Sequence, residues 1–205
     1  MTTENARRVL VLFAHPALQK SRIHRPMLRA LRGLESVTVH DLYEAYPDFD
    51  VDVGREQRLL SEHDAIVLQH PMYWYSTPPL VKQWEDLVLE HGWAYGTGGN
   101  ALSGKTLLCA VSTGGSESSY AADGANRHSV ADLLKPIELT ARLCGLDWLP
   151  PFVVHGTHAL GAQEIAGAAR DYRRLVEALR DGSLDVAGAR ALARINADLD
   201  RVLRS

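Results

Sequence analysis

The stretch Ala65–Glu90, AIVLQHPMYWYSTPPLVKQWEDLVLE, sets the plan of this chain, because a strand, an aromatic loop and a helix follow one another in it. Residues 65–69 are too few for a helix and rich in branched side chains, which predicts a strand buried on both faces. A loop is expected from His70-Pro71. Proline suits the first turn of a helix, which predicts a helix over Pro79–Glu90. Its inward residues should be Leu80, Trp84, Leu87 and Val88.

Three consecutive aromatic residues, Tyr73, Trp74 and Tyr75, stand between Pro71 and the pair Pro78-Pro79. Three adjacent rings cannot all face one core, and large exposed rings are costly unless something flat covers them. The loop follows a parallel strand, and open α/β sheets bind ligands beyond the carboxyl ends of their strands. We therefore expect these rings to pack against a flat ligand.

Composition limits the possible functions. The 205 residues are 46% hydrophobic and carry a formal charge of -3, so they can bury one sizeable core but do not attract nucleic acid or anionic lipid in general. We expect a single domain over residues 1–205, with a C-terminal helical extension at about 184–205. No apolar run approaches the roughly 20 residues of a membrane span, and the opening MTTENARR does not resemble a secretion signal, so the expected location is the cytoplasm.

The two cysteines, Cys109 and Cys144, are far apart and lack the spacing of a metal or redox motif. We expect both to be buried, inert thiols, and we expect no metal site.

Apolar runs alternate with segments of helical periodicity along the chain, which predicts an α/β sandwich of three layers around a five-stranded parallel sheet. The predicted strands are Arg8–Ala14, Val37–Asp41, Ala65–Gln69, Lys105–Thr113 and Phe152–His155. Beyond Pro79–Glu90, the predicted helices are Ile23–Leu34 with Ser21 as N-cap, Arg55–Glu62, Val130–Leu143, Gln163–Arg180 and Val186–Leu203, while Leu42–Val53 reads as a loop.

Three strand ends carry unusual loops: His15–Ser21, Pro71–Tyr75 and Ser112–Gly115. In a flavodoxin-like strand order these ends adjoin, and the point where the order reverses binds a mononucleotide. Amides before a helix bind phosphate, with His15 and Ser21 as added donors, and the bare Gly114-Gly115 amides can stabilise negative charge on a ring. A flavin fits these three demands, whereas the missing G-x-G-x-x-G motif disfavours dehydrogenase-type nicotinamide binding.

Five motifs carry a resemblance to a known family. They are AHP at 14–16, HPMYWYSTPPLVKQWED at 70–86, HGWAYG at 91–96, STGG at 112–115 and GLDWLPPF at 145–152. From about Val9 to His155 the chain resembles the flavodoxin-like NAD(P)H:quinone oxidoreductases. It is most similar to their short bacterial branch, which contains ancillary subunits of glutathione-gated potassium efflux systems.

The resemblance implies a set of cofactor contacts. They are His15, Ser21, Arg22, Ile23, His24, Met72, Tyr73, Trp74, Tyr75, Ser112, Thr113, Gly114 and Gly115. His24 is a departure, since relatives usually have Asn there. The short branch is associated with FMN, so FMN is expected rather than FAD.

The implied reaction is ping-pong: NAD(P)H reduces the flavin and leaves, and a quinone or similar electrophile then takes the hydride. By position, Tyr120 corresponds to a tyrosine near the substrate in this family. His128 is a candidate assistant, although Asn126 holds the ungapped position of the family's histidine. His155 and His158 are expected to be structural or surface residues.

The resemblance also implies partners. In this family the HGWAYG loop lies at a two-fold interface, which predicts a homodimer with Trp93 or Tyr95 exposed. The alternative function is a regulatory ancillary subunit of a potassium efflux antiporter, peripheral at the inner face of the membrane, with incidental redox activity. An electron-carrying flavodoxin fits less well, because such carriers are usually strongly acidic.

Overall fold

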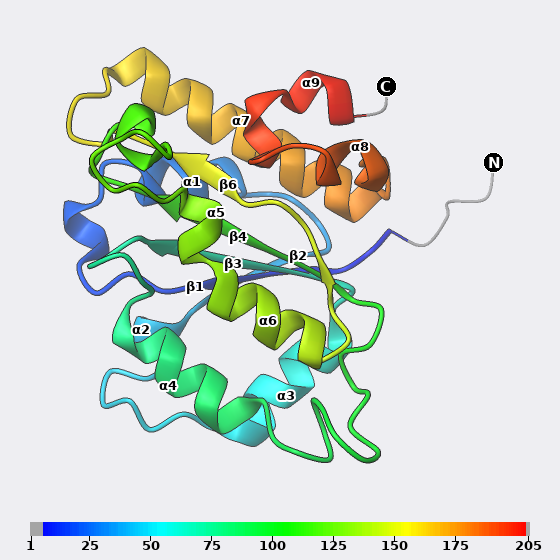
Figure 1. Ribbon diagram of the computed structural model, residues 1–205. Helices are drawn as coiled ribbons and strands as arrows, with labels where there is room; N and C mark the ends of the chain where they lie inside the picture. The colour runs from blue at the N-terminus through cyan, green and yellow to red at the C-terminus, as the bar shows by residue number, and fades with distance from the viewer. Residues whose placement is uncertain (1–5, 204–205) are drawn as a thin grey trace.

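The apolar, β-branched runs form the middle layer of the molecule, as one parallel sheet (Figure 1). The structure, a computed structural model, describes residues 6–203. The strands are β1 (Val9–Phe13), β2 (Val37–Asp41), β3 (Ala65–Pro71), β4 (Thr106–Ser112), β5 (Asp147–Trp148) and β6 (Phe152–Val154). Their order is β2-β1-β3-β4-β5, with β6 also paired to β4. The predicted fold class, a flavodoxin-like α/β sandwich, is confirmed.

Helices cover both faces of the sheet, each over its own apolar cluster (Figure 1). One face carries α1 (His24–Ala30), α7 (Ala162–Asp181), α8 (Val186–Arg190) and α9 (Leu199–Val202). The other carries α2 (Leu42–Ala45), α3 (Val53–Glu62), α4 (Pro79–Val88), α5 (Val130–Leu133) and α6 (Lys135–Leu143). Three short 3-10 turns complete the described elements: η1 (Leu18–Lys20), η2 (Glu117–Tyr120) and η3 (Ile195–Ala197).

The sheet differs from the prediction at two places. The expected loop at His70-Pro71 is wrong, since β3 continues through Pro71 and pairs there with β4. β1 has already ended opposite Gln69, so the missing amide hydrogen of Pro71 faces no strand on that side. The prediction also missed β5. Pro150-Pro151 interrupts what would be one edge strand, so β5 pairs with the start of β4 and β6 with its end.

Several helix boundaries follow local capping that the sequence reading missed. α3 begins before Arg55, because the side chain of Asp52 accepts the Arg55 amide at 2.9 Å. The predicted loop Leu42–Val53 contains the short helix α2, capped by Asp41. Leu87, predicted to face inward, is 37% exposed. The predicted Ser21 N-cap is also wrong by position: Ile23 flanks α1, although the Ser21 hydroxyl accepts the His24 amide at 2.9 Å.

The predicted helix over Val186–Leu203 is wrong. This segment forms α8, η3 and α9 instead, because its middle is bonded to the edge of the sheet. The Asn196 side chain accepts the Val153 amide and donates to the Val153 carbonyl, each at 2.9 Å, and the Ile195 amide donates to Pro151 at 2.9 Å. These contacts override the helical periodicity.

The structure can be compared with two predictions made from composition. Cys109 and Cys144 are buried free thiols, and burial raises the pKa of each, so their predicted burial is confirmed. Among residues 6–203, no helix is long and apolar enough to cross a membrane. Residues 1–5 and 204–205, the ends of the predicted domain and its extension, lie outside the described part of the chain.

Candidate functional site

The three predicted loops converge at the carboxyl edge of the sheet, where two adjoining hollows share Met72 and Tyr73. One hollow, of about 280 Å³, lies among the loops after β1, β3, β4 and β6. The other, of about 510 Å³, lies between the aromatic loop and Tyr120. Together they suit an elongated ligand with one polar end and one flat end.

Most predicted site residues line these hollows. They are His15, Ser21, Arg22, Ile23, Met72, Tyr73, Trp74, Tyr75, Ser112, Gly114 and Tyr120. Pro71, from the predicted aromatic loop, also lines the polar hollow, and three unpredicted residues join it: Lys20, Thr157 and His158. Lys20 could have been found, because it stands in the loop already expected to bind phosphate. The other two follow β6, where no motif marked the sequence.

His15 is held as a neutral ring that can donate one hydrogen bond into the polar hollow. Its Nδ1 accepts the amide of Ala17 at 3.0 Å, so the ring proton is on Nε2. Burial lowers the pKa of His15, which favours this neutral form. The ring meets Tyr73 edge to face, with centroids 5.9 Å apart. A hydrogen-bond donor therefore lies beside the aromatic loop.

A buried relay of polar groups runs beneath the same hollow. The Tyr172 hydroxyl donates to Gln69 Oε1 at 2.9 Å, and Gln69 Nε2 lies 3.1 Å from His24 Nδ1. An amide nitrogen can only donate, so His24 Nδ1 accepts and its proton is on Nε2. Burial lowers the pKa of His24 well below its usual value, in agreement with a neutral ring.

The relay ends at Ser112, which lines the polar hollow. His24 Nε2 lies 2.9 Å from the Ser112 hydroxyl and donates to it. The Ser112 hydroxyl hydrogen is then available for a group in the hollow. His24 itself is fully buried with both ring nitrogens engaged, so its contribution runs through Ser112.

Arg22 holds two loops of the site together. Its guanidinium donates to the carbonyls of Thr157, His158 and Leu160 at 3.1, 2.8 and 2.7 Å. These contacts join the loop after β1 to the loop after β6. Arg22 therefore shapes the polar hollow, and Lys20 lines that hollow as a second cation.

The aromatic loop is a tight hairpin turn with two strained residues at its tip. Tyr73 and Ser76 exchange two backbone hydrogen bonds, at 2.9 and 3.0 Å, across Trp74 and Tyr75. Both central residues have positive φ, 49° and 63°, where glycine and asparagine are normally preferred. Trp74 is 93% exposed, so its own packing does not offset the strain. Strain of this kind is typical of functional sites.

The glycine loop at the end of β4 is packed closely against two side chains. A Cβ on Gly114 would lie 3.0 Å from the His158 ring, and one on Gly115 would lie 3.1 Å from the Tyr120 ring. The two glycines therefore allow the rings of His158 and Tyr120 to pack directly against the backbone of this loop.

The two predicted catalytic residues are not together. Tyr120 lines the aromatic hollow, whereas His128 is exposed and outside both hollows. Asn126 is the residue of this segment that reaches the aromatic loop, with its side chain 3.4 Å from the Tyr75 hydroxyl. The histidine in contact with the Tyr120 ring is His155, at a centroid distance of 5.6 Å.

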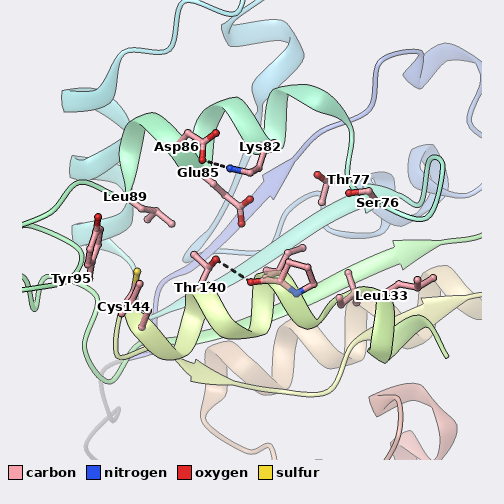
Figure 2. A pocket seen from close by; sticks show the side chains of 14 residues that line it. Ser76, Thr77, Lys82, Glu85, Asp86, Leu89, Tyr95, Leu133, Thr140 and Cys144 are labelled. Atoms are coloured by element: carbon pink, nitrogen blue, oxygen red, sulfur yellow. Dashed lines mark hydrogen bonds and ion pairs between the residues drawn. The ribbon is translucent and has the colours of Figure 1, made fainter. Parts of the chain in front are cut away.

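A separate groove of about 530 Å³ lies between α4 and α6 (Figure 2). It contains none of the predicted cofactor residues. Its walls include Leu89, Leu133 and Leu143, and Glu85 points into it from α4 toward α6 (Figure 2). Burial raises the pKa of Glu85 to about 7, with Asp86 adding to the effect and Lys82 opposing it.

Comparisons with known proteins agree with the fold described above. A family model described as having a flavodoxin-like fold matches residues 7–176. The NAD(P)H oxidoreductase YrkL of Bacillus subtilis is 46% identical over 173 residues, covering 84% of this chain and 98% of that protein. The potassium-efflux system ancillary protein KefG of Escherichia coli is 48% identical over 165 residues, covering 80% of this chain and 90% of that protein.

Two solved structures are similar as well. General stress protein 14 of Treponema denticola, crystallised with FMN, has a TM-score of 0.80 and 45% identity, covering 84% of this chain and 99% of that chain. An NADPH-quinone reductase from P. pentosaceus has a TM-score of 0.75 and 33% identity, covering 82% and 96%.

Replacing Gln69 should cost more stability than removing the hydroxyl at the start of the relay. Gln69→Leu leaves the Tyr172 hydroxyl and Nδ1 of His24 without a buried partner, while His24 keeps its hydrogen bond to Ser112, so we expect a loss of about 2–4 kcal/mol in unfolding free energy. Tyr172→Phe leaves only Gln69 Oε1 unpaired and should cost about 1–2 kcal/mol. Urea unfolding checks both values. Equal losses would mean that the His24 half of the relay contributes nothing.

Glu85 should make stability fall as pH rises. Its pKa of about 7 in the fold, against 4.5 as the ordinary value, means that the folded state holds the proton more tightly between these pH values. Glu85→Gln should therefore gain stability over the parent chain as pH rises through this window, reaching about 1–3 kcal/mol at pH 8. Thermal unfolding at pH 4.5 and pH 8 measures the difference. The exposed control Glu35→Gln should show no such trend.

Proposed function

The chain belongs to the family with the flavodoxin-like fold, and we propose that it is an FMN-dependent NAD(P)H oxidoreductase whose acceptor is a quinone or similar electrophile. The observation that carries this proposal is the pair of adjoining hollows, one polar and one walled by three exposed aromatic rings. The FMN-bound relative and the relatives named as NAD(P)H and NADPH-quinone reductases support it.

The polar hollow has the groups that a phosphate and a polyol chain require. Lys20 supplies positive charge, and the His15 ring and the Ser112 hydroxyl each supply a hydrogen to donate. His15 and His24 are neutral, so their hydrogen bonds add no charge that would change with pH near neutrality. Arg22 keeps the walls of the hollow in place.

The aromatic hollow has the shape that a flat ring system requires. When bound here, FMN would supply the chemistry of hydride transfer between NAD(P)H and the acceptor, in the ping-pong sequence that we propose. Tyr73, Trp74 and Tyr75 offer ring faces, and Gly114 lines the adjoining polar hollow. Tyr120 holds its hydroxyl hydrogen at neutral pH, since burial raises its pKa, and can donate to an acceptor oxygen.

Release of the cofactor tests the proposal. The purified protein should be yellow, and heating it should release FMN that chromatography identifies. The loaded protein should oxidise NAD(P)H when a quinone such as menadione is present. Colourless protein that neither binds added FMN nor oxidises NAD(P)H would overturn the proposal, and released FAD would correct the cofactor.

A second candidate role is regulation of a potassium efflux antiporter. The observation that favours it is the 48% identity to KefG over nearly the whole length of that protein. In this role the protein would work in the cytoplasm, at the inner face of the membrane. Co-purification with a potassium/proton antiporter from the same cells tests it, and failure to bind any such antiporter leaves the soluble reductase as the function.

We also propose a homodimer, which the groove between α4 and α6 supports. Leu143, which lines the groove, and Leu139 are exposed leucines of α6. Tyr95, from the predicted interface loop, lines the groove, although Trp93 and Tyr95 are half-buried rather than exposed as the sequence predicted. A second copy over this face would cover both the leucines and the loop.

A charge on the exposed face of α6 should separate the two copies. Leu143, 64% exposed, can become Glu with little cost to the fold, whereas a carboxylate in an apolar interface is strongly unfavourable. Light scattering should show a dimer of the 22.6 kDa chain and mainly monomer for Leu143→Glu. The control Val39→Glu, on the edge strand β2, should stay dimeric. A monomeric parent chain at micromolar concentration would contradict the proposal.

Relaxing the aromatic turn should stabilise the protein and weaken its cofactor binding. The double variant Trp74→Asn, Tyr75→Gly places the preferred residue types at the two positive-φ positions. We expect the ligand-free protein to gain about 1 kcal/mol in unfolding free energy, because strain is relieved and little packing is lost. FMN affinity, measured by fluorescence quenching, should fall at least about tenfold through loss of aromatic contact. Unchanged affinity would show that these rings do not contact the flavin.

A further inference from the structure

The C-terminal segment, residues 184–203, lies beyond the residues 7–176 that the family model matches, yet it reaches the site. Arg194 of this segment donates from Nη2 and Nε to one carboxylate oxygen of Glu117, at 2.7 and 3.2 Å. Glu117 begins η2, the turn that ends at Tyr120. A residue outside the family match is therefore bonded to the turn that carries the proposed donor.

The position of Arg194 is fixed by its neighbours in the chain. The amide of Ile195 donates to the Pro151 carbonyl at 2.9 Å, and the Asn196 side chain forms two hydrogen bonds with Val153 of β6. Ile195 is also fully buried. Arg194 thus projects from a point anchored to the sheet edge, so its ion pair ties η2 to the rigid part of the molecule.

His155, directly after β6, lies where the two segments meet. Its ring contacts the ring of Tyr120, and its Nδ1 lies 3.1 Å from the hydroxyl of Thr113. The Thr113 hydroxyl donates to the Gly115 carbonyl at 2.8 Å, so it accepts from His155, whose neutral ring carries its proton on Nδ1. His155 therefore links Tyr120 to the glycine loop.

The charges that face His155 come from both of these segments. Burial lowers the pKa of His155, the Glu117 carboxylate raises it, and the Arg194 guanidinium lowers it. The other groups against its ring are the Tyr120 phenol and the Thr113 hydroxyl. The ion pair thus balances two opposite charges beside one half-buried imidazole.

We propose that Arg194 and His155 are positioning residues of the site. Arg194 holds the η2 turn through Glu117, and His155 keeps Tyr120 and the glycine loop in fixed positions relative to each other. The C-terminal segment is then part of the acceptor side of the site rather than a cover for the sheet alone. The catalytic meaning of this arrangement rests on the proposed reductase function, whereas the arrangement itself does not.

Removing either partner of the ion pair should shift the pKa of His155, in opposite directions for Arg194 and Glu117. Arg194→Gln removes the positive neighbour, so the pKa of His155 should rise, and Glu117→Gln removes the negative neighbour, so it should fall. Arg194→Lys keeps the charge and should restore most of the parent value. The matched control is Arg190→Gln, from the same segment, which breaks an ion pair to Asp147 away from the site.

Proton NMR of the histidine rings in the ligand-free chain measures these shifts, with His155→Gln identifying the resonance. In the FMN-loaded protein, kcat/KM for menadione should fall about 2–5-fold in Arg194→Gln, as expected for an exposed ion pair, and remain unchanged in Arg190→Gln. The pH profile of kcat/KM for menadione should shift in opposite directions in Arg194→Gln and Glu117→Gln.

The outcomes separate this inference from the proposed function. Opposite shifts of the His155 titration support the arrangement even if the protein binds no flavin, which would overturn only the reductase proposal. A His155 titration that is unchanged in Arg194→Gln, or shifted the same way by both variants, overturns the inference. An active flavoprotein in which Arg194→Gln and Arg190→Gln have equal kcat/KM for menadione also overturns it.

Discussion

One carboxamide in the central strand constrains the layers around it. Gln69 is fully buried in β3, where an unpaired polar group would be costly, so each end of its amide must find a partner. Its oxygen is bonded to Tyr172 of α7 and its nitrogen to His24 of α1. These two hydrogen bonds therefore help to fix α1 and α7 relative to β3. His24 in turn donates a hydrogen bond to Ser112, which lines the polar hollow, so the packing of the core is connected to the site.

The site combines rigid support with local strain. Buried or firmly bonded groups such as His15, His24 and Arg22 form its polar half, while the aromatic half stands on a turn whose two tip residues have unfavourable backbone angles. The turn stands between β3, which pairs with β4 as far as Pro71, and the start of α4. A rigid scaffold can keep such a strained turn, whose three rings are exposed instead of packed in the core.

The sequence predicted what depends on local pattern and failed where distant contacts decide. Apolar runs identified the central strands, and prolines and glycines identified the three loops, because each of these signals acts within a few residues. The break of the expected helix at Val186–Leu203 depends on Asn196 bonding to Val153, and the contact of Tyr120 with His155 instead of His128 depends on β6 lying beside β4. Neither pairing leaves a trace in the periodicity of either segment. Pro150-Pro151 did carry a readable signal for the divided edge strand, which the pattern of apolar residues concealed.

The bond between Asn196 and Val153 also bears on how the protein behaves in a crowded solution. An outer strand offers free amides and carbonyls to any extended peptide, including a strand of another molecule, and so invites aggregation. Here a side-chain amide occupies the donor and the acceptor of Val153 as a neighbouring strand would. No further strand can pair with β6 at Val153, although the sheet has gained no extra strand there. The C-terminal segment therefore opposes the growth of the sheet between molecules.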